Sequence, residues 1–111
     1  MPMSQDISPV NSELVDHLAL SSQMQWIETR SGQTYVKVLW LGSETGRWAV
    51  LFKWRKGYVA PPHKHLSAAH TFVLSGRLRV RDGILEPGDY VYEPNGMVHE
   101  ETTALEDTEY L

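Results

Sequence analysis

The chain has 111 residues, of which 41% are hydrophobic and 22% charged, so its length and composition predict a single globular domain. A net charge of −4 without a basic run argues against nucleic acid as a partner. No apolar run is long enough to span a membrane, and the first residues lack a signal-peptide pattern, so we expect a cytoplasmic protein. The absence of cysteine excludes disulfides, thiolate nucleophiles and cysteine-ligated metal sites.

Residues 1–23 are predicted to form an N-terminal arm, in which residues 13–20 are either a short helix that Ser12 is able to cap or an irregular segment. From residue 24 to residue 111 the pattern changes to short runs rich in β-branched and aromatic residues, separated by turns. We expect strands within residues 24–28, 35–41, 47–54, 70–75, 77–81, 90–93, 98–102 and 106–111. So many short strands with almost no helix indicate an all-β sandwich or barrel.

The last of these predicted strands reaches Leu111, where the sequence stops. A strand that ends at a sheet edge offers unpaired backbone groups to a second copy of the chain. We therefore expect a homodimer.

Histidines dominate the chemistry of residues 57–76. His63 and His65 are two positions apart and point to one face if the segment after Pro62 is extended, which the two prolines favour. His99 follows the predicted turn at residues 94–96 and is the candidate for a third ligand. Neutral imidazole binds iron, zinc, nickel and copper, and a site with three protein ligands retains an open position for catalysis or sensing.

Other residues near these histidines have alternative interpretations. If Ala69 faces the interior, strand alternation directs His70 outward, where it is a fourth ligand, a pocket residue or an ordinary strand histidine. Asp82 and Glu93 are either carboxylates that orient a ligand imidazole or solvent-exposed groups. The large aromatic residues that are candidates for the pocket wall or the core are Trp40, Trp48, Trp54, Phe72, Tyr90 and Tyr92.

The histidine pattern resembles the two motifs of the cupin superfamily. The first motif, G-x5-H-x-H-x3-E-x6-G, is matched in spacing by Gly57, His63, His65, Ala69 and Gly76. The second motif, G-x5-P-x-G-x2-H-x3-N, is matched by Gly88, Pro94, Gly96, His99 and Thr103. The resemblance implies a double-stranded β-helix, the cupin jelly-roll barrel, over residues 24–111.

One departure bears on the metal site, because Ala69 stands where the cupin motif has a carboxylate ligand. The resemblance then implies a divalent transition metal held by His63, His65 and His99, with Fe²⁺ favoured and Zn²⁺ or Ni²⁺ as alternatives. This set is similar to the three-histidine cupin dioxygenases that cleave acetylacetone or dihydroxyacetophenone, which predicts an enzyme acting on a small dicarbonyl or hydroxyketone with O₂.

Two other functions stay open at this point. One is a metal or small-ligand sensor similar to the cupin-like domain of zinc-binding anti-sigma factors, although Ala69 argues against that group. The other is an isomerase or another cupin whose chemistry is not oxidative.

Overall fold

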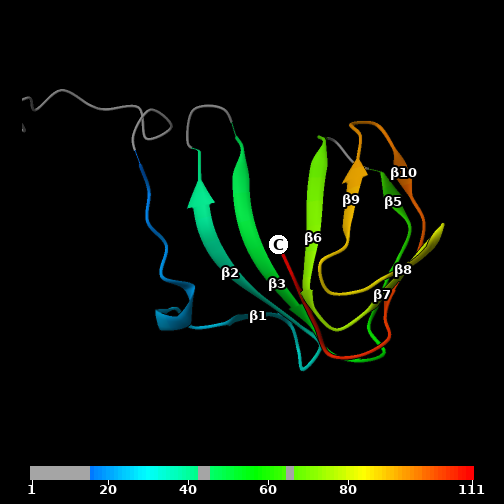
Figure 1. Ribbon diagram of the computed structural model, residues 1–111, viewed down its shortest axis with the longest axis horizontal. Coiled ribbons are helices and arrows are strands. Elements are labelled where there is room, and N and C mark those ends of the chain that lie inside the picture. The colour runs from blue at the N-terminus through cyan, green and yellow to red at the C-terminus, as the bar shows by residue number, and fades with distance from the viewer. Residues whose placement is uncertain (1–15, 43–45, 65–66) are drawn as a thin grey trace, which may run out of the picture.

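The computed structural model describes residues 16–42, 46–64 and 67–111, without the side chains of Lys64 and His99. Almost all regular structure in these residues is strand, which confirms the all-β prediction (Figure 1). The expected helix at 13–20 lies partly outside the described residues, and residues 16–20 are not helical. A short 3-10 helix, η2 (Ser21–Gln23), follows them. No helix in the described ranges is long and apolar enough to cross a membrane.

The larger sheet is antiparallel and, within the described residues, contains six strands in the order β1-β2-β3-β12-β6-β9. Their bounds are β1 Ile27–Arg30, β2 Thr34–Leu41, β3 Trp48–Trp54, β6 Ala69–Ser75, β9 Tyr90–Glu93 and β12 Thr108–Tyr110. The longest pairing is the hairpin of β2 and β3, whose register runs from Thr34 opposite Trp54 to Leu41 opposite Trp48.

Facing the larger sheet are shorter strands. In the part of the chain that is described, four of them form a sheet in the order β4-β11-β7-β8, and β5 pairs with β10. Their bounds are β4 Val59–Ala60, β5 His63–Lys64, β7 Leu78–Val80, β8 Gly83–Leu85, β10 Val98–His99 and β11 Thr102–Ala104. Figure 1 shows these strands curving around the side of β6 and β9 that is remote from β1.

The position of β12 corrects one expectation. The last strand does not lie at an edge, because β12 is inserted between β3 and β6 and pairs with both. Beyond β12, the backbone of Leu111 exchanges two hydrogen bonds with Phe72, of 2.7 and 2.8 Å. The unpaired-edge argument for a homodimer is therefore wrong, and the homodimer itself stays a prediction.

The core lies where the two sheets meet. Val73 of β6, Leu78 of β7 and Ala104 of β11 are almost fully buried, and Trp54, Leu85 and Tyr110 pack against them. The alternation predicted for residues 77–81 is present, since Leu78 is buried while Arg79 is exposed.

The segment before β1 is attached to the outer face of the β2–β3 hairpin. Lys37 is 8% exposed and its ammonium donates to the carbonyl of Ser21 in η2, at 2.6 Å. The Trp26 ring lies within 4.7 Å of the Lys37 ammonium and 4.6 Å of the Lys53 ammonium, in cation–π geometry. These contacts hold the segment that contains Ser21 and Trp26 on the outer face of the hairpin. The inner face of β3 is therefore not covered by this segment.

The turn between β6 and β7 depends on Gly76, which the first motif includes. Gly76 has φ +82°, and a Cβ at this position would lie 2.3 Å from the hydroxyl oxygen of Thr108 and 2.4 Å from the carbonyl oxygen of Asp107. Thr108 is fully buried, and its hydroxyl accepts a hydrogen bond from the Arg77 backbone N–H at 3.0 Å. Because glycine has no side chain, the turn at Gly76 is able to pack closely against β12.

We expect Gly76→Ala to destabilise the fold by about 2–5 kcal/mol. The cost of placing alanine in a left-handed backbone conformation adds to the cost of the steric overlap with Thr108 and Asp107. Gly57→Ala is the matched control, since Gly57 has φ +91° but none of the described atoms lies within 4 Å of the place that a Cβ would occupy. That variant should lose only about 1–2 kcal/mol. Urea unfolding of the two variants measures the difference, and equal losses would contradict the proposed contact with Thr108.

Candidate metal and substrate site

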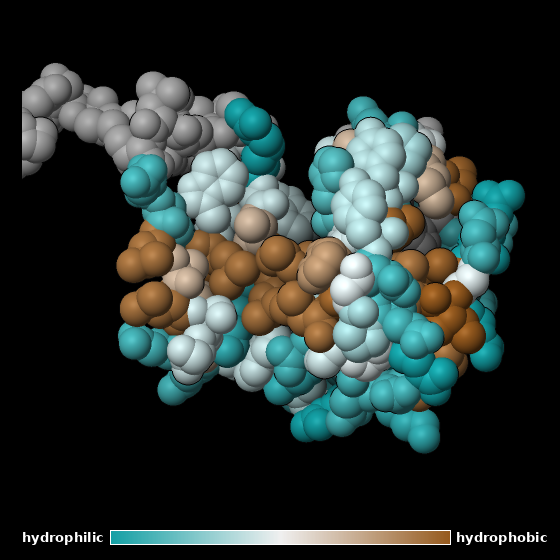
Figure 2. All heavy atoms as spheres, viewed as in Figure 1, coloured by the Kyte–Doolittle hydropathy of each residue, from teal (hydrophilic) through white to brown (hydrophobic). Residues whose placement is uncertain are grey.

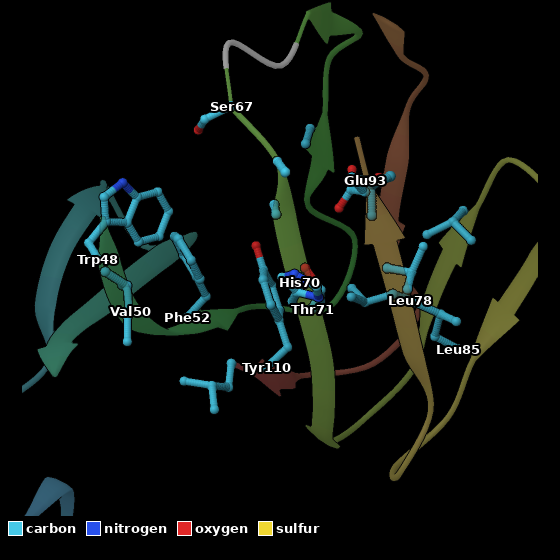
Figure 3. Close-up of a pocket in the computed structure, with 18 of the residues that line it drawn as sticks. Trp48, Val50, Phe52, Ser67, His70, Thr71, Leu78, Leu85, Glu93 and Tyr110 are labelled. Atoms are coloured by element: carbon cyan, nitrogen blue, oxygen red, sulfur yellow. The ribbon is translucent and has the colours of Figure 1, made fainter. Parts of the chain in front are cut away.

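A pocket of about 760 Å³ lies between the larger sheet and the shorter strands. Its described lining is mainly apolar and aromatic, with β3, β6 and β12 forming one wall (Figure 3). Figure 2 shows apolar residues gathered in a band across the face of the molecule that is presented in Figure 1, with hydrophilic residues below them. A pocket of this size and polarity suits a small organic ligand.

The aromatic wall is built by alternation along β3. Trp48, Val50, Phe52 and Trp54 point inward at every second position and line the pocket. Phe52 stacks on Tyr110 with ring centroids 4.9 Å apart, and Trp54 meets Tyr110 edge to face at 5.2 Å. Each such pair contributes about 0.5–1.5 kcal/mol beyond burial, so the ring contacts stabilise the apolar wall.

His63 lies at the opening of this pocket, since it lines the pocket and is also exposed. Its Nδ1 is 3.0 Å from the carbonyl oxygen of Pro61. Because a carbonyl only accepts, Nδ1–H donates in this contact, and in the neutral ring Nε2 then carries the lone pair. Metal-binding histidines commonly have this arrangement, with one ring nitrogen held by a backbone carbonyl and the other directed to the metal.

The backbone brings His99 opposite His63. The two residues are direct partners in the antiparallel pair of β5 and β10, so both positions are on one face of that pair. His65 lies outside the described residues, as does the side chain of His99. Among the side chains that are described, no three metal-ligating groups cluster, and that set omits two of the three predicted ligands.

Ala69 and Glu93 face each other across β6 and β9. Both line the pocket, and Glu93 is buried, with 6% of its surface exposed. The solvent-exposed alternative for Glu93 is therefore wrong. Asp82, by contrast, is exposed in the turn between β7 and β8.

The His70 side chain contacts exposed tyrosines on the outer face of the larger sheet, as expected from its position beside Ala69, although His70 is also among the residues that border the pocket. Its Nδ1 is 2.5 Å from the Tyr90 hydroxyl, and its ring lies 5.0 Å from that of Tyr92. Tyr90 and Tyr92 are about half exposed, as is Phe72. These three aromatic residues, and Trp40, are not among the described residues that line the pocket, whereas Trp48 and Trp54 are.

The sequence interpretation missed Phe52 and Tyr110 as pocket residues. Phe52 could have been found, because it shares the inward alternation of Trp48 and Trp54 in an uninterrupted strand. Tyr110 could not, since nothing in the sequence places the last strand beside β3.

Tyr110 is the titratable group whose chemistry the pocket changes most clearly. Burial raises the pKa of Tyr110 well above its ordinary value of 10.0, and the nearby negative charge of Glu93 raises it further. The phenol therefore remains neutral inside the pocket and keeps its proton.

The family model of the ChrR cupin-like domain matches residues 15–111. The chain belongs to this cupin family. The facing sheets with a pocket between them are thus the cupin barrel that the two motifs implied, and the match shows that Ala69 does not separate the chain from the ChrR cupin-like domains. A search of curated proteins found no match.

Solved cupin structures share the fold. An acetylacetone dioxygenase from Acinetobacter johnsonii is 17% identical with a TM-score of 0.73, over 99% of this chain and 77% of that one. A provisionally assigned acetylacetone dioxygenase from Methylibium petroleiphilum is 20% identical with a TM-score of 0.78. The match covers 92% of this chain and 78% of that one. The anti-sigma factor ChrR of Rhodobacter sphaeroides, solved with SigE, is 24% identical with a TM-score of 0.67, over 81% of this cupin and 49% of that chain.

The raised pKa of Tyr110 predicts a loss of stability in alkali. The unfolded chain releases the phenol proton near pH 10 and the folded cupin does not, so the free energy of unfolding should fall above pH 10, by up to about 1.4 kcal/mol per pH unit. Urea unfolding between pH 8 and pH 11 should show a smaller decline for Tyr110→Phe. The exposed Tyr90→Phe should decline like the wild type, and an unchanged decline in Tyr110→Phe would contradict the assignment.

Proposed function

We propose that this cupin binds one divalent transition metal through His63, His65 and His99 and acts as a small dioxygenase. The observation that supports it most directly is the location of His63 at the edge of an apolar pocket and opposite His99 in the pairing of β5 with β10. The ring of His63 is also oriented by the contact of Nδ1 with the carbonyl of Pro61. The donors fit a transition metal, because they are imidazole nitrogens with no thiolate and the ring of His63 is oriented by a backbone carbonyl.

The pocket suits a small dicarbonyl or hydroxyketone. Its apolar wall at Val50 and Phe52 would contact the carbon chain of the substrate and exclude water, while the histidine end would receive the two oxygen atoms. Three neutral imidazoles do not balance the charge of a divalent ion, so an enolate with two oxygen donors is the favoured ligand form. Ferrous iron, when bound, would supply the activation of O₂.

The chain's own groups would handle protons and solvent. Tyr110 keeps a neutral hydroxyl at the inner wall, where it is able to donate a hydrogen bond to a substrate oxygen. The aromatic wall of β3 and β12 holds that hydroxyl in place through ring contacts. Cleavage of one C–C bond in a 1,3-diketone by one O₂ yields a carboxylic acid and a 1,2-dicarbonyl, with one oxygen atom in each product.

The test is anaerobic loading with Fe²⁺ followed by exposure to O₂ with a panel of 1,3-diketones and hydroxyketones. We expect O₂ uptake equal to substrate loss for at least one compound. His63→Ala should lower that rate at least a hundredfold, whereas His17→Ala, which removes an exposed histidine far from the two motifs, should leave it unchanged. Loaded protein that neither binds nor consumes any compound of the panel would refute the enzyme proposal.

A second function, a metal-dependent sensor, is supported by the family match and by the likeness to ChrR, a structure solved with SigE. A sensor must change its assembly or its partner binding when metal binds. Sedimentation velocity of metal-free and Zn²⁺-loaded protein distinguishes the two functions. The dioxygenase proposal predicts the same molecular mass in both, and a metal-dependent change of mass would favour the sensor. The same data test the expected homodimer.

A further inference from the structure

The metal site of this cupin lacks the carboxylate of the first motif, since residue 69 is alanine. Among the described residues that line the pocket, Glu93 is the one acid. Its place in the fold is directly opposite residue 69, as the partner of Ala69 in the pairing of β6 with β9.

We propose that Glu93 supplies the missing carboxylate to the metal from the neighbouring strand. This inference rests on the proposed metal-binding function and deepens it. Directly opposed residues of an antiparallel pair project to one face with Cβ atoms about 4.5–5.5 Å apart. The glutamate side chain is long enough to cover that offset, and the small side chain of Ala69 leaves room for it to do so.

Burial supports this role. Glu93 is 6% exposed and projects from β9 into the pocket, as Figure 3 shows, although its neighbour Tyr92 is 49% exposed. In a site that excludes water, the attraction between this carboxylate and a divalent cation at the histidine end of the pocket is stronger than it would be in solvent.

Chain connectivity supports it as well. Glu93 ends β9, and a tight turn in which the Met97 N–H donates to the Pro94 carbonyl at 3.2 Å leads into β10. That strand contains His99, whose backbone partner is His63. Glu93 and the strand that contains His99 therefore flank one short turn.

A carboxylate on β9 in place of one on β6 would have a consequence for the substrate. With Glu93 bound, a divalent ion would retain one positive charge, as in a four-ligand cupin, and a monoanionic enolate would neutralise it. Ala69 lines the pocket together with Thr71 of the same strand, so β6 presents small side chains to the substrate.

The experiment measures Co²⁺ binding by calorimetry and by the visible spectrum of the bound ion. We expect Glu93→Gln to weaken Co²⁺ binding about 10- to 100-fold and to alter the spectrum. Glu86→Gln is the matched control, since it removes an equal charge from an exposed turn and should change neither readout. The double variant Ala69→Glu, Glu93→Gln returns a carboxylate to β6 and should recover most of the affinity.

The outcomes separate this inference from the proposed function. Co²⁺ binding that His63→Ala abolishes but Glu93→Gln leaves within about threefold of wild type would overturn the role of Glu93 alone. Wild-type protein that is folded but binds no Co²⁺ would overturn both proposals. Thermal melting of each metal-free variant shows whether it is folded, and weak binding by a well-folded Glu93→Gln variant supports the inference even where the double variant fails to fold.

Discussion

The insertion of β12 between β3 and β6 is the constraint on which the rest of this cupin depends. Without it the hairpin of β2 and β3 would have no connection to β6 and β9 within the larger sheet. The same strand contributes Thr108 to the contact with Gly76 and Tyr110 to the aromatic wall of the pocket. One short strand therefore joins the two halves of the sheet and completes the ligand-binding surface.

Much of the fold could be predicted from local patterns. Strand alternation in residues 47–54 and 77–81, together with glycine and proline turns, was sufficient for the all-β class, and the two histidine motifs were sufficient for the cupin barrel. The location of β12 could not be predicted, because the pairing of a short strand with two distant ones depends on the whole topology. The central position of that strand also removes the edge on which the homodimer argument relied.

The candidate site also combines features that could be predicted from the sequence with features that could not. The spacing of His63 and His65 is local, and a family pattern linked them to His99; the structure adds the backbone pairing of His63 with His99. The burial of Glu93 was beyond sequence reasoning, because a glutamate before a proline in a short strand is ordinarily exposed. Glu93 matters because its cross-strand partner is Ala69. Residue 69 is the position where the first cupin motif has a carboxylate and this chain has none.

The central position of β12 also determines when the larger sheet is able to form. During synthesis, β3 and β6 emerge long before β12, and until then each has an unpaired edge that is able to pair with other chains. Pairing of β12 with β3 joins residues far apart in the chain, such as Tyr110 and Phe52, which makes this a step with a large loop-closure entropy. The sheet thus completes late, and the facing edges of β3 and β6 remain available to other chains until β12 fills the gap between them.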